Sequence, residues 1–99
     1  MWARKDTMSE GYSQHQVDAL AKLWRRGLFG GKYQPIEQVL SATPREHHDK
    51  AKEALDELHK DGMIVYHKNR KCVSINTRYK EKVREILRGE IPGYILDLH

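Results

Sequence analysis

Residues 54–64 read Ala-Leu-Asp-Glu-Leu-His-Lys-Asp-Gly-Met-Ile, and they give the clearest indication of the fold in the sequence. Leu55 and Leu58 lie three positions apart, a spacing that places both side chains on one face of a helix. Gly62 follows the helical pattern, and glycine readily adopts the left-handed conformation that ends many helices. The two apolar residues after it are typical of the start of a buried strand. The stretch therefore predicts a helix that is anchored on the core and leads directly into a strand.

The start of this helix is indicated by residues 43–46, Thr-Pro-Arg-Glu. Thr43 is a favourable N-cap residue, proline is favoured at the first helical position, and glutamate at the third completes a capping box. We therefore expect a helix over residues 44–60, preceded by a short helix over residues 35–40 with Pro35 in its first turn. The long helix is expected to bury Ala51, Ala54, Leu55 and Leu58. Two helices joined by a short turn form a helix-turn-helix.

Another helix is expected to begin after Ser13. Gln16 follows this N-cap residue by three positions, as in a capping box, while Tyr12 and Val17 have the spacing of a hydrophobic staple. Gly27 is expected to end the helix. Its apolar stripe is expected to comprise Val17, Leu20, Ala21 and Trp24, with Leu23 at the margin. Residues 1–12 are expected to be a flexible lead-in to the domain.

Beyond Gly62 the pattern changes from helical to extended. Residues 63–66 and 72–75 are short β-prone runs, separated by the polar residues 67–71. Asn69, at the centre of that segment, is a residue type that tolerates the positive φ of tight turns. These features predict a β-hairpin.

The C-terminal part is expected to contain a further helix and an apolar tail. Asn76 and Thr77 can cap the helix, which is expected to end before Gly89. The face expected to be apolar comprises Tyr79, Val83, Ile86 and Leu87. We expect the tail, residues 89–99, to pack on the domain or on a partner, because it is rich in large apolar residues.

Composition limits the class of protein. A chain of 99 residues is of a size for one domain, here 13–88, and 38% hydrophobic residues suffice for a small core. No apolar run is long enough to span a membrane, and the first residues do not form a secretory signal, so we expect a cytoplasmic protein. The single cysteine, Cys72, cannot form an internal disulfide or a cysteine zinc site.

The order helix, helix, helix, hairpin, helix resembles the winged-helix family of helix-turn-helix proteins. Residues 54–64 carry the resemblance, since they match the family's Leu-x-x-Leu-x-x-x-Gly-hydrophobic-hydrophobic pattern. The small size and the Trp-Arg-Arg-Gly-Leu-Phe-Gly-Gly connection of residues 24–31 are similar to small archaeal winged-helix proteins. The resemblance implies an α+β, mostly helical fold with a three-helix core, a β-hairpin wing and a C-terminal helix.

The resemblance also implies double-stranded DNA as the partner and transcription regulation as the role. In the family the third helix usually enters the major groove, while the wing contacts the neighbouring backbone or minor groove. The positions that match the family's base-contacting residues are Arg45, His48 and Lys52. The wing offers Lys68, Asn69, Arg70 and Lys71.

The distribution of charge leaves other interpretations open. Residues 67–88 contain eight basic and two acidic side chains, whereas residues 43–62 contain four basic and six acidic ones. Carboxylates repel phosphate, so DNA affinity is expected to come from the wing and the helix after it. The exposed face of the third helix can also be a solvated surface with ion pairs between residues four apart, such as Arg45 with Asp49 and Lys52 with Asp56.

Two alternatives to a simple DNA-binding protein follow. The acidic third helix or the apolar tail can dock a protein partner, which would make the chain a protein-interaction module. The tail can also join two copies into a homodimer that binds two half-sites.

The residues give no indication of catalysis or of a cofactor. The six histidines include the adjacent pair His47 and His48, which point about 100° apart on a helix and cannot share one ion. His47 is expected on the apolar flank of its helix, in a core or boundary role. No nucleophile elbow or phosphate-binding glycine loop is present in the sequence. We therefore expect a protein that is not an enzyme and that binds no metal or cofactor.

Overall fold

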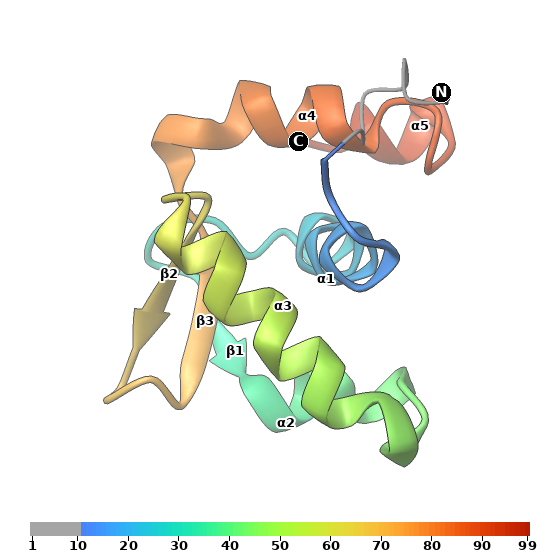
Figure 1. Ribbon diagram of the computed structural model, residues 1–99. Helices are drawn as coiled ribbons and strands as arrows, with labels where there is room; N and C mark the ends of the chain where they lie inside the picture. The colour runs from blue at the N-terminus through green and yellow to red at the C-terminus, as the bar shows by residue number, and fades with distance from the viewer. Residues whose placement is uncertain (1–10) are drawn as a thin grey trace.

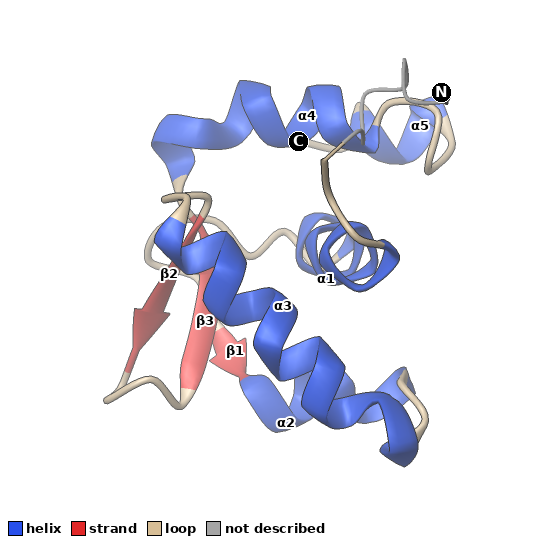
Figure 2. Cartoon of the chain, viewed as in Figure 1, coloured by secondary structure: helices blue, strands red, loops and turns tan. Residues whose placement is uncertain are grey.

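The computed structural model describes residues 11–99, which form a set of helices and one small sheet (Figure 1, Figure 2). The lead-in expected over residues 1–12 lies, up to residue 10, outside the described residues. The α-helices are α1 (Gln14–Arg25), α2 (Ile36–Val39), α3 (His48–Lys60), α4 (Lys80–Leu87) and α5 (Gly93–Leu96). The strands are β1 (Gln34–Pro35), β2 (Ile64–His67) and β3 (Cys72–Ile75), and the 3₁₀ segments are η2 (Leu40–Ala42), η3 (Arg45–His47) and η4 (Thr77–Tyr79). The expectation of a mostly helical α+β fold is confirmed.

The first helix begins where the sequence predicts it. The Ser13 hydroxyl accepts a hydrogen bond from the Gln16 N–H at 3.2 Å, and the Gln16 side-chain oxygen accepts one from the Ser13 N–H at 2.7 Å. These reciprocal bonds form the expected capping box. Gly27 follows the helix with a φ of +68°, a left-handed conformation that residues with a side chain adopt only with strain.

Helix α1 lies in the middle of the molecule, between α3 on one side and α4 with α5 on the other (Figure 1). Because both sides are covered, its buried surface is wider than the single stripe that the sequence predicts. Leu23, expected at the margin, is fully buried together with Leu20 and Trp24. Ala21, expected in the stripe, is only half-buried.

The sheet has three antiparallel strands in the order β1-β3-β2. The sequence predicts both strands of the hairpin, but it places the first strand one residue too early. Met63 precedes β2 and does not belong to it. Strand β1 is missing from the prediction: Gln34 pairs with Val73 and Pro35 with Cys72. The placement of Pro35 in a helical turn was therefore wrong, because it lies in an edge strand just before α2. An edge strand is a position where the missing N–H of proline is tolerated.

The start of α3 differs from the prediction. The Thr43 hydroxyl accepts a hydrogen bond from the Lys22 ammonium on α1 and makes no cap contact. Pro44 has an extended backbone, with φ −55° and ψ 142°, and Arg45–His47 form one 3₁₀ turn before α3 begins at His48. The capping box expected at residues 43–46 is thus absent, because the hydroxyl that would form it is held towards α1.

The end of α3 follows the prediction closely. Gly62 has a φ of +85°, and the Met63 N–H donates to the Leu58 carbonyl at 3.0 Å, a bond typical of glycine-ended helices. The expected inner face, Ala51, Ala54, Leu55 and Leu58, is buried. The chain then enters β2, and the register of Ile64 with Ile75 through His67 with Cys72 places the hairpin loop at Lys68–Lys71.

The C-terminal segments cover the far side of α1. Asn76 caps η4 as expected, its side-chain oxygen accepting from the Arg78 N–H at 3.0 Å. On α4 the residues Val83, Ile86 and Leu87 are buried. Tyr79, expected on the same face, is exposed because it belongs to η4, where its ring lies over Gly62.

The tail packs back on the domain. The Trp24 indole N–H donates to the Ile95 carbonyl at 3.2 Å, and Ile91 and Leu96 are buried in the core. Tyr94 and Leu98 stay on the surface, 74% and 62% exposed. Within residues 11–99 no helix is both long and apolar enough to span a membrane.

Candidate nucleic-acid interface

The surface of interest is formed by one flank of α3 and by the loop of the β2–β3 hairpin. Lys52 lies on α3 and is exposed, as are all four loop residues, Lys68, Asn69, Arg70 and Lys71. A groove of about 180 Å³ separates the helix from the hairpin. Its lining comprises Ile36, Lys52, Leu55, Asp56, Tyr66 and Arg70. Of the residues expected to bind DNA, the structure thus brings Lys52 and Arg70 together at one groove. The flank of α3 and the hairpin loop (Lys68–Lys71) that lie on either side of this groove are called the α3–loop surface below.

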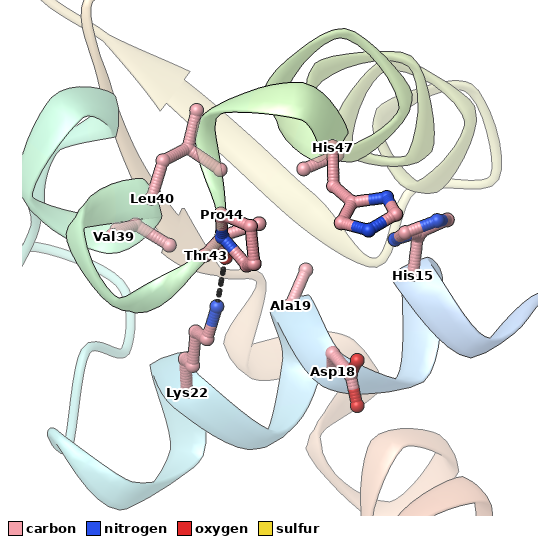
Figure 3. A pocket seen from close by; sticks show the side chains of 10 residues that line it. His15, Asp18, Ala19, Lys22, Val39, Leu40, Thr43, Pro44 and His47 are labelled. Atoms are coloured by element: carbon pink, nitrogen blue, oxygen red, sulfur yellow. Dashed lines mark hydrogen bonds between the residues drawn. The ribbon is translucent and has the colours of Figure 1, made fainter.

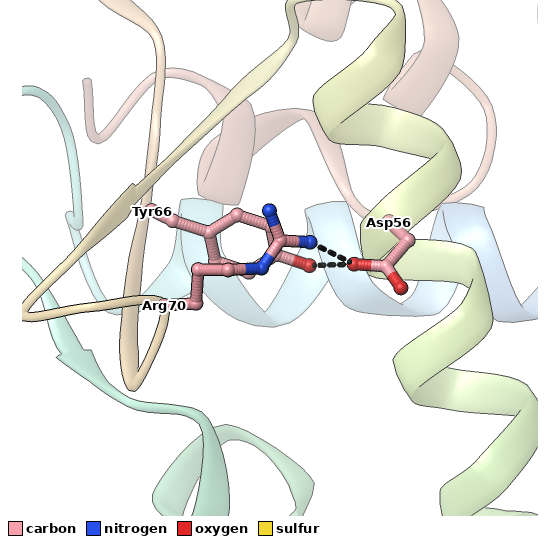
Figure 4. Close-up of polar contacts among 3 residues, drawn as sticks. All are labelled: Asp56, Tyr66 and Arg70. Carbon is pink, nitrogen blue, oxygen red and sulfur yellow. Dashed lines mark hydrogen bonds and ion pairs between the residues drawn. The ribbon is translucent and has the colours of Figure 1, made fainter.

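A cluster of three polar side chains crosses this groove (Figure 4). The Tyr66 hydroxyl donates to Asp56 Oδ1 at 2.5 Å, and Arg70 Nη2 donates to the same oxygen at 2.9 Å. The Arg70 guanidinium also lies over the Tyr66 ring, 4.4 Å from its centroid. The hairpin is therefore tied to α3 by a carboxylate that belongs to the helix.

The cluster shifts the protonation of two of its members. The hydrogen bond from Tyr66 holds the pKa of the Asp56 carboxyl below its usual range, and the charge of Arg70 acts in the same direction. Burial, followed by the hydrogen bond to Asp56, raises the pKa of Tyr66 far above that of a free tyrosine. Near neutral pH this gives an ionised carboxylate that accepts from a neutral phenol and a guanidinium.

The hairpin loop has a tight backbone. Lys68, Asn69 and Arg70 have φ values of 55°, 58° and 70°, so three consecutive residues adopt the left-handed conformation. The Lys71 N–H closes the loop by donating to the His67 carbonyl at 3.1 Å. Asparagine tolerates this conformation, as the sequence predicts for Asn69. For lysine and arginine the left-handed conformation costs about 1 kcal/mol of conformational energy per residue. The strained loop places its basic side chains on the surface.

Contacts of the hairpin strands near the loop hold the hairpin to the body of the domain. The buried Ser74 hydroxyl donates to the Gly30 carbonyl at 2.9 Å and lies 3.0 Å from His67 Nε2. The ring of Tyr33 stacks on the ring of His67, with 4.3 Å between centroids. The loop is consequently presented on a hairpin that is anchored on both strands.

Arg45 and His48 lie at the beginning of α3, outside the lining of the groove. Arg45 is exposed in η3. The His48 ring is half-buried, and its Nε2 lies 2.9 Å from the Thr43 carbonyl, so the ring helps to hold the turn before α3. Arg45 is thus the freer of the two to contact a ligand.

The ion pair of α3 differs from those that the sequence favours. Arg45 with Asp49 and Lys52 with Asp56 have the right spacing, but in the described part of the chain Asp56 pairs across the groove with Arg70 at 2.9 Å. The side chains of that pair are 51% and 60% exposed, so both remain open to solvent. The acidic side chain of Asp56 is therefore paired with a residue of the hairpin loop.

The basic helix that follows the hairpin does not extend this surface. Helix α4 begins after the end of β3 that lies away from the loop, at the opposite end of the sheet (Figure 1). Lys80 lies over the ring of Phe29 and Arg84 over the ring of Trp24, each 5.2 Å from the centroid. The two basic segments that were expected to supply the phosphate contacts together therefore lie at opposite ends of the sheet.

A second hollow, of about 360 Å³, lies between α1 and the start of α3 (Figure 3). Its wall is mostly apolar, with the Lys22–Thr43 hydrogen bond at one end and His15 and His47 at the other. His47, expected on the apolar flank, is exposed, and its ring lies 5.6 Å from that of His15. The lining of this hollow shares no residue with the groove at the hairpin.

The described residues offer no metal centre, since no group of three or more His, Cys, Asp or Glu side chains within residues 11–99 is placed to hold an ion. Cys72 is half-buried on β3 and is a free thiol. In comparisons of this chain with protein-family models, with curated proteins and with solved structures, no match was found. The function must therefore be argued from the geometry of the chain.

Asp56 and Tyr66 are the members of the surface that sequence reasoning missed as a pair. They lie ten positions apart, on a helix and on a strand, and no local pattern links them. The available signal was the Gly62 turn between them, which brings the end of α3 against the following strand. Knowing that turn, one could expect a polar residue of β2 to face an acid on the last turns of α3.

Proposed function

We propose that this chain is a winged-helix protein that binds duplex DNA through the α3–loop surface and acts in transcription regulation. The order of elements supports the first part, because α1, β1, α2, α3 and the β2–β3 hairpin follow one another as in a winged helix, with β1 beside β3. In this proposal α3 is the reading helix and Lys68–Lys71 is the tip of the wing.

The observation that carries the proposal is the position of the basic wing loop. Lys68, Arg70 and Lys71 are exposed in one four-residue loop, and Arg70 lines the groove together with Lys52 of α3. Duplex DNA presents a regular row of phosphates, and each cation that neutralises one releases a condensed counterion. A loop with three cations beside an exposed helix can follow the backbone while the helix lies in the major groove.

The test is binding of the purified chain to a labelled duplex of about 20 base pairs, measured by fluorescence anisotropy between about 50 and 200 mM salt. The double variant Lys68→Glu/Lys71→Glu is expected to bind at least about ten-fold more weakly, with a salt slope lower by roughly one unit per lost contact. The matched control is Lys82→Glu/Arg88→Glu, which makes the same change of net charge on α4 and at the residue that follows it, where both side chains are exposed. The control is expected to retain most of the affinity, since charges beyond about 10 Å are screened. Absence of binding at the lowest salt, or equal losses in both variants, contradicts the proposal.

The alternative is a protein-interaction module, and the exposure of Tyr94 and Leu98 on α5 and the chain end favours it. Exposed large apolar residues are a common element of protein interfaces. Light scattering of the wild type and of the Tyr94→Ser/Leu98→Ser variant distinguishes a homodimer from a monomer. A wild type that associates and a variant that does not, combined with no affinity for DNA, favour the alternative.

A further inference from the structure

The cluster at the groove raises the question of what Arg70 contacts when no DNA is bound. Asp56 Oδ1 accepts both from Tyr66 at 2.5 Å and from Arg70 at 2.9 Å, and the Tyr66 ring supports the guanidinium from one side (Figure 4). The arginine is therefore drawn from the loop towards α3. Its partner is a carboxylate. Two oxygens of a carboxylate can accept hydrogen bonds from a guanidinium in the same way as two oxygens of a phosphate.

The pair is accessible to a competitor. The side chain of Arg70 is 60% exposed and that of Asp56 is 51% exposed, so a phosphate can approach the guanidinium without unfolding the hairpin. Exposed ion pairs contribute little to stability, whereas arginine binds phosphate tightly and often through two parallel hydrogen bonds. A phosphate near Arg70 would also come close to the negative charge of Asp56. Contact with DNA and contact with Asp56 therefore oppose one another.

We propose that Asp56 occupies Arg70 in place of a DNA phosphate and thereby lowers the affinity of the α3–loop surface for DNA. The inference rests on the proposed function and assigns a role to the acidic character of α3 that the DNA-binding interpretation alone leaves unexplained. Asp56 then determines how tightly, and with how steep a dependence on salt, the wing binds the duplex.

The salt dependence separates this role from simple repulsion. In the wild type, an Arg70 that stays on Asp56 neutralises no phosphate and releases no counterion from the DNA. Without the carboxylate, Arg70 is free to neutralise one more phosphate, and the release of one more counterion makes the salt slope steeper by roughly one unit. A carboxylate that only repels DNA would change the affinity in the same way whether or not Arg70 is present.

The experiment compares four variants with the wild type in the duplex-binding assay: Asp56→Asn, Asp49→Asn, Arg70→Gln and Asp56→Asn/Arg70→Gln. Asp49 is the matched control, because it is an exposed acid two turns earlier on the same flank of α3, and among residues 11–99 the carboxylate paired with Arg70 is that of Asp56. Asparagine retains an oxygen that can accept from Tyr66, and circular dichroism checks that each variant is folded.

We expect Asp56→Asn to bind about three- to ten-fold more tightly than the wild type, with the steeper slope, and Asp49→Asn to gain less. In the Arg70→Gln background, Asp56→Asn is expected to gain no more than Asp49→Asn does in the wild type. If Asp56→Asn binds more weakly than the wild type, Asp56 positions Arg70 for DNA and the proposal is overturned. Equal gains from Asp56→Asn and Asp49→Asn also overturn it, and leave the proposed function intact. Lack of binding by the wild type and all four variants rejects the proposed function and this inference together.

Discussion

At the scale of single residues, Asp56 and Tyr66 form the contact with the clearest dependence on pH. The pKa of Asp56 is lowered in the folded state and that of Tyr66 is raised. A lowered carboxyl pKa contributes stability above the unfolded value, about 4, and loses it as pH falls through the folded pKa. A raised phenol pKa contributes stability below the unfolded value, about 10, and loses it as pH rises beyond that value. The contact is therefore at full strength between about pH 5 and 9.

The variant Tyr66→Phe tests this contact. It removes one hydrogen bond to an exposed carboxylate, so we expect a loss of about 0.5 kcal/mol, or a decrease in Tm of roughly 2–4 °C, at neutral pH. The difference from the wild type is expected to shrink below about pH 4 and above about pH 10. Thermal denaturation of both proteins across this pH range measures the difference. A difference that stays constant from about pH 3 to about pH 11 would argue against the contact.

Gly62 is the residue on which the end of α3 depends most. Its φ is +85°, and a Cβ there would lie 3.2 Å from the Tyr79 ring. We expect Gly62→Ala to lower the free energy of unfolding by about 1–2 kcal/mol, through left-handed strain and displacement of the ring. Gly31→Ala is the control, because Gly31 has no positive φ and no atom within 4 Å of the added carbon. Urea denaturation of both variants compares them, and equal effects would contradict the role of Gly62.

At the scale of elements, α5 contributes to the core although it lies beyond residues 13–88, over which the sequence predicts the domain. Leu96 is buried and the neighbouring carbonyl of Ile95 accepts from the Trp24 indole, so the tail closes one side of α1. Leu96→Ala is expected to cost about 2–3 kcal/mol, because it leaves a cavity in the hydrophobic core. Leu98→Ala, at a position 62% exposed, is expected to stay within about 0.5 kcal/mol of the wild type. Chemical denaturation measures both, and a large effect of Leu98→Ala alone would show that the tail packs differently.

The elements that could be predicted are those whose signals are local. The capping box at Ser13, the glycine ends of α1 and α3 and the two hairpin strands depend on neighbouring residues, and the structure has them within a residue or two. Strand β1 could not be found from its own two residues, because its pairing with β3 exists only in three dimensions. The capping box expected at Thr43 is a local pattern too, but the Thr43 hydroxyl accepts its hydrogen bond from Lys22, 21 positions earlier in the chain, and does not cap the helix.

The candidate site shows the same division. The exposure of the loop cations and the turn at Asn69 could be predicted, since both follow from the composition of a hairpin tip. The pairing of Arg70 with Asp56 could not, because it joins side chains 14 positions apart across the groove. The separation of α4 from the loop depends on the direction of β3, which the charge pattern of residues 67–88 does not contain.

At the scale of the whole molecule, the distribution of charge matters more than its total of +4. The sheet holds two basic regions apart, the wing loop at one end and α4 at the other, and α3 presents acids between its cations. In the proposed function only the loop and one flank of α3 meet the duplex. The acidic side chains then limit the affinity, and Asp56 makes its dependence on salt shallower.

The central claim, that DNA binds at the α3–loop surface, is tested most directly by mapping backbone amide chemical shifts of the labelled protein during titration with a short duplex at low salt. We predict that the largest shifts fall at residues 45–56 and 68–71, while the amides of α4 and α5 change little. Shifts concentrated around Tyr94 and Leu98, or no shifts at a salt concentration of about 50 mM, would contradict the account.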